Sequence, residues 1–163
     1  LFTSLNQSFI TIGRLVKTGG IIAVIDYYKK LGDDFYQELV DMLVFDAIIL
    51  NEDRHFGNFG LLIDNHTNKI IAPAPIFDNG LSLLCYAMEN DFDQESQYIK
   101  TRQPATYDQF IDFVKPLMTN RQKEKVRKIL NFHFDKKSNY KLPNKRLKQL
   151  EKIVQEQAKQ LLS

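Results

Sequence analysis

Residues 51–58 read Asn-Glu-Asp-Arg-His-Phe-Gly-Asn, and residues 77–80 read Phe-Asp-Asn-Gly. Short apolar runs typical of strands lie between them. The chain thus presents an acid at 53, a carboxamide at 58 and a second acid at 78, with a predicted hairpin between the last two. This order of side chains predicts the polar part of a phosphoryl-transfer site.

Asp53, Asn58 and Asp78 supply the groups that phosphoryl transfer requires. The reaction needs a base for the hydroxyl of the acceptor and ligands that hold cations against phosphates. Asp53 is the candidate base, and Gly57 lets the backbone turn so that Asn58 faces the same point. Asp78 arrives beyond the hairpin and can share Mg²⁺ with Asn58, because Mg²⁺ prefers oxygen ligands. Each residue alone is typical of a cap or a turn, but the combination favours a kinase-type site.

Two helices are predicted before this loop. Residues 21–31 form a short helix that ends at Gly32, where a left-handed cap suits glycine. Asp33 or Asp34 then caps a second helix that runs to about Leu50. Its apolar stripe contains Phe35, Leu39, Met42, Leu43, Ile49 and Leu50.

Asp46 falls on the same stripe. A buried carboxylate without partners is costly, so we expect Asp46 to accept hydrogen bonds from the following loop. In that case it orients Arg54 and His55. The alternative is that Asp46 lies at the edge of the stripe and reaches water.

The remaining pattern predicts an α+β domain that is mainly helical, with one β-hairpin after the candidate catalytic loop. Residues 59–63 and 69–72 are the two strands, joined by a polar turn. Pro73 and Pro75 stiffen the approach to Asp78, and Gly80 gives freedom after it. Residues 81–104 are predicted to form a surface loop with an acidic patch at 89–95. Helices are predicted from Thr106 or Asp108 to about 117, over roughly 120–131, and after Pro143 as far as Leu162.

Composition indicates a single soluble globular domain. The chain has 163 residues, of which 44% are hydrophobic and 26% charged, and it lacks any apolar run as long as a bilayer span. Cys85 is the single cysteine, which fits a reducing compartment, so a cytoplasmic location is expected. No role is assigned to Cys85, His66 or His133. The sequence starts at Leu1 without a leader, and we expect it to be a piece of a longer protein.

Charge is divided unevenly along the chain. Residues 1–114 contain 8 Lys and Arg against 16 Asp and Glu, a net −8, while residues 115–163 contain 14 against 4, a net +10. The basic residues concentrate in 121–128 and 136–152 at helical spacing. Solvated helix faces explain this pattern most simply, and a surface for nucleic acid or an acidic protein partner is the alternative.

Residues 50–60 together with residues 74–83, Ala-Pro-Ile-Phe-Asp-Asn-Gly-Leu-Ser-Leu, resemble the catalytic core of the HipA-like kinases. The resemblance covers about residues 35–85. It implies the C-terminal lobe of a protein-kinase-like fold, with ATP and Mg²⁺ as cofactors. The best-known members of that family are serine/threonine kinase toxins of bacterial toxin–antitoxin systems, so it also implies a protein acceptor and an antitoxin-like partner.

The resemblance also implies a role for each residue of the site. Asp53 would be the catalytic base, and Asn58 and Asp78 would be the magnesium ligands at the nucleotide. The Asp-Arg-His-x-x-Asn string is similar to that of phosphatidylinositol kinases, in which the histidine is implicated in catalysis. His55 is therefore a second candidate catalytic residue, or else a residue that only hydrogen-bonds the backbone.

Two parts of a kinase site are missing from the sequence. No glycine-rich run such as Gly-x-Gly-x-x-Gly occurs, and no strand lysine precedes the candidate catalytic loop at a suitable distance. We therefore expect an N-terminal lobe that this chain lacks, and weak ATP binding and transfer by these residues alone. Two other functions stay open: a kinase for lipids or small molecules, and a non-catalytic module that binds a partner or nucleic acid through its basic C-terminal helices.

Overall fold

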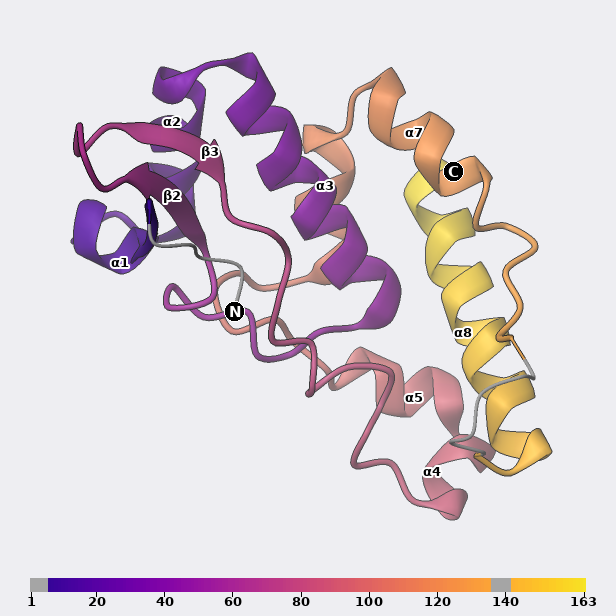
Figure 1. Ribbon diagram of the computed structural model, residues 1–163. Coiled ribbons are helices and arrows are strands. Elements are labelled where there is room, and N and C mark those ends of the chain that lie inside the picture. The colour runs from indigo at the N-terminus through magenta and orange to yellow at the C-terminus, as the bar shows by residue number, and fades with distance from the viewer. Residues whose placement is uncertain (1–5, 136–141) are drawn as a thin grey trace.

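Helix α3 (Asp33–Ile49) runs through the middle of the molecule, in a computed structural model that describes residues 6–135 and 142–163 (Figure 1). Helix α2 (Gly20–Leu31) and a small sheet lie on one side of α3, and α7 (Asn120–Arg127) and α8 (Asn144–Leu162) lie on the other (Figure 1). Because both sides are covered, more of α3 is buried than one stripe. Of the predicted stripe, Leu39, Met42, Leu43 and Leu50 are buried and Phe35 and Ile49 are half-buried, while Val40, Val44, Ala47 and Ile48 are buried in addition.

The junction between α2 and α3 is the single residue Gly32. Its φ and ψ of +133° and 166° differ from those of the predicted left-handed cap, yet they too are accessible mainly to glycine. The predicted capping by Asp33 or Asp34 is wrong, because Gly32 is the N-cap and both acids lie within the first turn of α3. Their charges there still interact favourably with the helix dipole.

The predicted hairpin is present, and a third strand extends it. Strands β2 (Gly60–Asp64) and β3 (Ile70–Pro73) pair antiparallel, and β1 (Gln7–Thr11) pairs antiparallel with the other edge of β2. Strand β1 was not predicted, because its partner strand lies about 50 residues further along the chain. A short helix, α1 (Ile12–Leu15), follows β1. At Gly60, a Cβ would lie 2.0 Å from the ring of Phe9 and 2.8 Å from the carbonyl oxygen of Ile10. The close pairing of β1 and β2 at this point therefore requires glycine.

The predicted surface loop over residues 81–104 is wrong in part. It contains two short helices, α4 (Glu89–Asp93) and α5 (Glu95–Lys100), which lie near the N-terminal end of α8 (Figure 1). Helices this short have little stability of their own and depend on tertiary packing. Phe92 of α4 is buried in the core and supplies such packing.

The C-terminal helices follow the predicted order with shorter bounds. The predicted helix near Thr106 begins only at Phe110, as α6 (Phe110–Val114), and passes into the 3₁₀ turn η1 (Lys115–Leu117), which contains Pro116. Helix α7 ends at Arg127, four residues before the predicted end. Helix α8 agrees with the prediction, and its stripe of Leu150, Ile153, Val154, Ala158 and Leu161 is buried.

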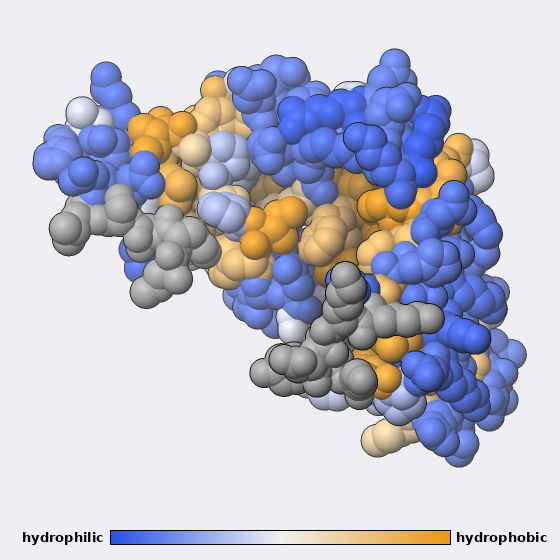
Figure 2. Space-filling model, turned by 45° about the vertical axis from the view of Figure 1, so that its right-hand side comes forward, coloured by the Kyte–Doolittle hydropathy of each residue, from blue (hydrophilic) through white to orange (hydrophobic). Residues whose placement is uncertain are grey.

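Some basic residues of the C-terminal half form ion pairs with acidic residues of the N-terminal half. Arg121 and Lys125 of α7 form ion pairs with Asp41 of α3, and Arg121 also contacts Glu38. The basic half of the chain thus binds the acidic half at this interface, while residues 136–141 of the basic cluster lie outside the described part. Figure 2 shows one face that is mostly hydrophilic, with a band of hydrophobic side chains across a hollow in its middle. Among the described residues, none of the helices combines the length and apolar character that a bilayer crossing needs.

Candidate active site

The loop that follows α3 is tightly folded on itself. Leu50 ends the helix in a left-handed conformation (φ +53°), and the amide of Asn51 donates to the Asp46 carbonyl at 2.9 Å. Within the loop, the His55 amide donates to the Asp53 carbonyl and the Asn58 amide donates to the His55 carbonyl, both at 2.8 Å. These bonds fix the backbone on which Asp53, His55 and Asn58 stand.

Arg54 is buried completely and connects three segments. Its Nε and Nη2 donate to the two carboxylate oxygens of Asp46 on α3, at 2.8 and 2.9 Å. Nη1 donates to the carbonyl of Phe77 at 2.6 Å and to that of Asn58 at 3.4 Å, and Nη2 also donates to Oδ1 of Asn79 at 2.6 Å. The planar guanidinium has several donors in a fixed fork, which suits it to this junction. Arg54 therefore holds the 51–58 loop and the 77–79 segment against α3.

Asp46 has the role that the sequence predicts for it with respect to Arg54. Its side chain is fully buried and accepts hydrogen bonds from Arg54 and from Nδ2 of Asn51 (2.9 Å), so it does not reach water. Burial raises the pKa of Asp46, and the hydrogen bonds and charge of Arg54 oppose that rise. Oδ1 of Asn51 in turn accepts the amide of Asp53 at 3.2 Å. The network thus extends from α3 to the backbone of the candidate base.

Asp78 reaches the site through a constrained segment. Its φ of +58° lies in the left-handed region, which aspartate adopts more readily than most residues, and neighbouring contacts fix it there. Those contacts are the two bonds of Arg54 to Phe77 and Asn79 on either side of Asp78. The ring of Phe77 also packs edge-on against that of Phe9 in β1, with centroids 5.5 Å apart.

The structure brings Asp53, His55 and Asp78 together. Ligand atoms of the three side chains all lie within 4.8 Å of one another, with Asp53 half-buried and the other two exposed. Nδ1 of His55 accepts the amide of Gly57 at 3.0 Å, so in the neutral ring the proton is on Nε2. A Cβ on Gly57 would lie 2.7 Å from the His55 ring, so a larger residue at 57 would shift that ring.

Asn58 is buried beside this group. Its Nδ2 donates to the Asp53 carbonyl at 3.0 Å, which sets the orientation of the carboxamide. Its Oδ1 accepts no hydrogen bond from the residues that the structure describes, so this oxygen is the atom that Asn58 can offer to a cation.

No role was predicted for Asn51 or Asn79, and Arg54 was predicted only to be oriented by Asp46. All three take part in the network that joins the two site segments. One signal for this network was available, because Asp46 on an apolar stripe required a buried donor. The carbonyl of Phe77, which Arg54 binds, is a backbone atom and leaves no signal in the sequence.

Comparison with known proteins supports a kinase-like fold. The sequence matches no protein-family model and no curated protein. Among solved structures, it is similar to the crystal structure of a Helicobacter pylori proinflammatory kinase, CtkA, with a TM-score of 0.68 and 18% sequence identity. The similarity covers 99% of this chain and 70% of that chain. The shared property is the fold, and membership of the HipA-like family stays a prediction from the sequence.

Proposed function

We propose that this chain is the catalytic part of a phosphotransferase that moves the γ-phosphate of ATP to a hydroxyl group. The observation that carries the proposal is the meeting of Asp53, His55 and Asp78, which come from two separate segments, within 4.8 Å. A single buried arginine, Arg54, holds both segments in place. The kinase-like fold of the whole chain supports the same activity.

In this proposal Asp53 is the base that accepts the proton of the acceptor hydroxyl. Its backbone is held by Asn51 and by the loop's own hydrogen bonds, while its side chain is half-exposed and can be reached. Fixing the base before the substrate arrives lowers the entropic cost of reaching the transition state.

The oxygen donors of the site suit magnesium. Asp78 offers a carboxylate and Asn58 offers Oδ1, and both are ligand types that Mg²⁺ accepts alongside waters and phosphates. Bound there with ATP, the ion would neutralise charge on the phosphates. His55 offers nitrogen, which suits Mg²⁺ less, so we propose that its Nε2–H donates to a phosphate oxygen.

The finer identity of the enzyme rests on the motif resemblance. We propose a HipA-like serine/threonine kinase with a protein acceptor, and a toxin–antitoxin context with an antitoxin-like partner follows from the same resemblance. The 163 residues contain neither a glycine-rich run nor a candidate nucleotide lysine. We therefore also propose that fast transfer requires a second lobe that covers the phosphates, and that this chain alone transfers slowly.

The test compares charge-neutral variants under single-turnover conditions with radiolabelled ATP and Mg²⁺. Asp53→Asn and Asp78→Asn should abolish transfer, and Asp78→Asn should also weaken Mg²⁺-dependent nucleotide binding in a calorimetric titration. Asp26→Asn on the exposed face of α2 removes the same charge and should change neither quantity. The proposal fails if wild type shows no Mg²⁺-dependent nucleotide binding, or if the Asp53→Asn protein transfers phosphate at the wild-type rate.

A further inference from the structure

The segment that follows Asp78, residues 81–88, is anchored to the candidate catalytic loop at its start. The carbonyl of Leu81 accepts the amide of Glu52 at 3.0 Å, and the amide of Leu83 donates to the carbonyl of Ile49 at 2.7 Å. Glu52 is the neighbour of Asp53 in the chain, so this segment and the candidate base share one backbone junction.

The same segment is strained. Leu83 and Leu84 are consecutive residues with φ of +52° and +53°, a conformation that residues with a Cβ adopt rarely and almost never in succession. Gly80, just before the segment, is exposed, and a Cβ there would meet nothing within 4 Å. The bonds of Leu81 and Leu83 hold the start of the segment, and contacts at Leu84 and beyond also offset the strain.

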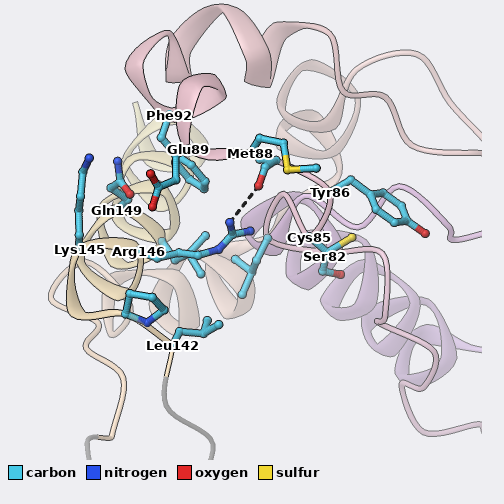
Figure 3. Close-up of a pocket in the computed structure, with 14 residues that line it drawn as sticks. Ser82, Cys85, Tyr86, Met88, Glu89, Phe92, Leu142, Lys145, Arg146 and Gln149 are labelled. Atoms are coloured by element: carbon cyan, nitrogen blue, oxygen red, sulfur yellow. Dashed lines mark hydrogen bonds between the residues drawn. The ribbon is translucent and has the colours of Figure 1, made fainter.

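Arg146, in the first turn of α8, supplies those contacts. Its Nη1 donates to the carbonyl of Ala87 at 2.9 Å and its Nη2 to the carbonyl of Leu84 at 3.1 Å. The guanidinium also lies over the ring of Phe92 in α4, 4.9 Å from its centroid. Figure 3 shows Arg146 reaching from α8 across the pocket to the backbone beside Met88.

A cavity of about 710 Å³ lies beside this contact (Figure 3). Its walls are mainly apolar and come from the 81–88 segment, α4 and the start of α8. Tyr86 and Met88, which are 71% and 73% exposed, stand at its surface. Because Arg146 fixes the backbone of one wall, the shape of this cavity depends on it.

We propose that Arg146 is a positioning residue for phosphotransfer. It holds residues 81–88 in the strained conformation that joins Leu81 to Glu52, the neighbour of Asp53, and it fixes the cavity wall that these residues form. Two arginines then secure the neighbourhood of Asp78: Arg54 binds the residues on either side of it, and Arg146 binds the segment downstream. This role rests on the proposed function.

The first measurement is independent of activity. Hydrogen exchange followed by mass spectrometry should show faster exchange of the amides of residues 83–88 in Arg146→Ala, by about tenfold or more, because a hydrogen bond from a charged donor is lost at each carbonyl. Exchange in residues 35–48 of α3 should not change. Lys148→Ala, an exposed lysine on the same helix, is the matched control and should behave as wild type.

The second measurement separates positioning from stability alone. In Arg146→Ala, kcat/KM for the acceptor should fall by about tenfold or more, whereas the Kd for Mg²⁺ and nucleotide should stay within about twofold, because no contact of Arg146 reaches Asn58 or Asp78. Arg146→Lys keeps the charge and the stem but cannot fork to both carbonyls, so both effects should be intermediate. This variant also tests the proposal if Arg146→Ala does not fold.

Three outcomes decide between the proposals. Wild-type transfer with unchanged exchange in both Arg146 variants would overturn the role of Arg146 and leave the proposed function intact. Faster exchange with unchanged acceptor kinetics would show that the contact is structural and would overturn the positioning role. Absence of transfer by wild type, together with faster exchange in the variants, would overturn the proposed function while the backbone contact stands.

Discussion

Helix α3 carries two aspartates, Asp46 and Asp41, that bind side chains outside the helix in different environments. Asp46 pairs with Arg54, and both side chains are fully buried. Asp41 pairs with Arg121 and Lys125 of α7, whose side chains are 39% and 52% exposed. The first pair organises the candidate active site, and the second joins two helices at the surface.

The two environments give the pairs different energetics. An exposed pair gains little, because water screens the charges and long side chains lose entropy. A buried pair gains more from each contact, but both charges have lost their hydration, so the loss of one partner leaves the other uncompensated. The Asp46–Arg54 pair is thus suited to fix one geometry. The Asp41 pairs join α3 to α7, and the loss of one of these partners should cost little stability.

The largest effect is expected for Arg54→Ala. It leaves Asp46 buried without its cation and frees the 77–79 segment, so the free energy of unfolding should fall by about 3–5 kcal/mol. Phosphotransfer should be lost as well, since Asp78 loses the bonds on both sides of it. Urea denaturation and single-turnover transfer measure the two effects.

Arg54→Lys should recover part of the stability and little of the transfer, because an ammonium group cannot bridge three segments. A loss below about 1 kcal/mol would place this pair with the exposed ones.

The next largest effect is a difference in coupling energy between the buried pair and the exposed pair, measured by double-mutant cycles. The coupling energy between Asp46 and Arg54, measured with alanine variants by urea denaturation, should reach about 2–3 kcal/mol. The coupling between Asp41 and Arg121 should lie at about 0.2–1 kcal/mol. Equal coupling energies would show that burial does not distinguish the two pairs.

The proximity of the site residues could be predicted from the sequence because it depends on short-range structure. A tight loop places Asp53, His55 and Asn58 together, and one hairpin returns the chain to Asp78. The roles of these residues as base and ligands stay predictions. The position of Asp46 on an apolar stripe also predicted a buried partner, and the structure confirms Arg54 in that place.

The contacts that secure the site from further away could not be predicted. Arg54 was expected beside Asp46, but its bonds to Phe77 and Asn79, 23 and 25 residues further along the chain, leave no pattern in the sequence. Arg146 binds carbonyls about 60 residues earlier in the chain, and backbone acceptors have no sequence signature. Strand β1 was missed for the same reason, since its pairing with β2 is a long-range contact.

A smaller effect is expected for Arg121→Ala. The variant removes contacts with Asp41 and Glu38, yet Lys125 still pairs with Asp41 at 2.5 Å and Gln122 donates to it at 3.0 Å. The free energy of unfolding should fall by about 0.2–1 kcal/mol. Transfer should be unchanged, because none of these side chains contacts the 51–58 loop. A fall in kcat with unchanged stability would mean that the α3–α7 contact affects the candidate active site. The buried and exposed pairs would then differ in their effect on stability but not in their effect on transfer.

The smallest effect is the response of these variants to salt. Raising KCl from about 0.1 M to about 1 M shortens the Debye length from about 10 Å to about 3 Å, which weakens attraction between exposed charges. The stability difference between wild type and Arg121→Ala should therefore shrink to less than about half. The difference for Arg54→Ala should stay constant, because no solvent lies between Arg54 and Asp46. Each comparison uses wild type at the same salt concentration, so general effects of KCl on hydrophobic burial cancel. If the stability difference between wild type and Arg54→Ala shrinks in the same proportion, water reaches the Asp46–Arg54 pair. In that case the position of Asp78 does not depend on a pair of desolvated charges.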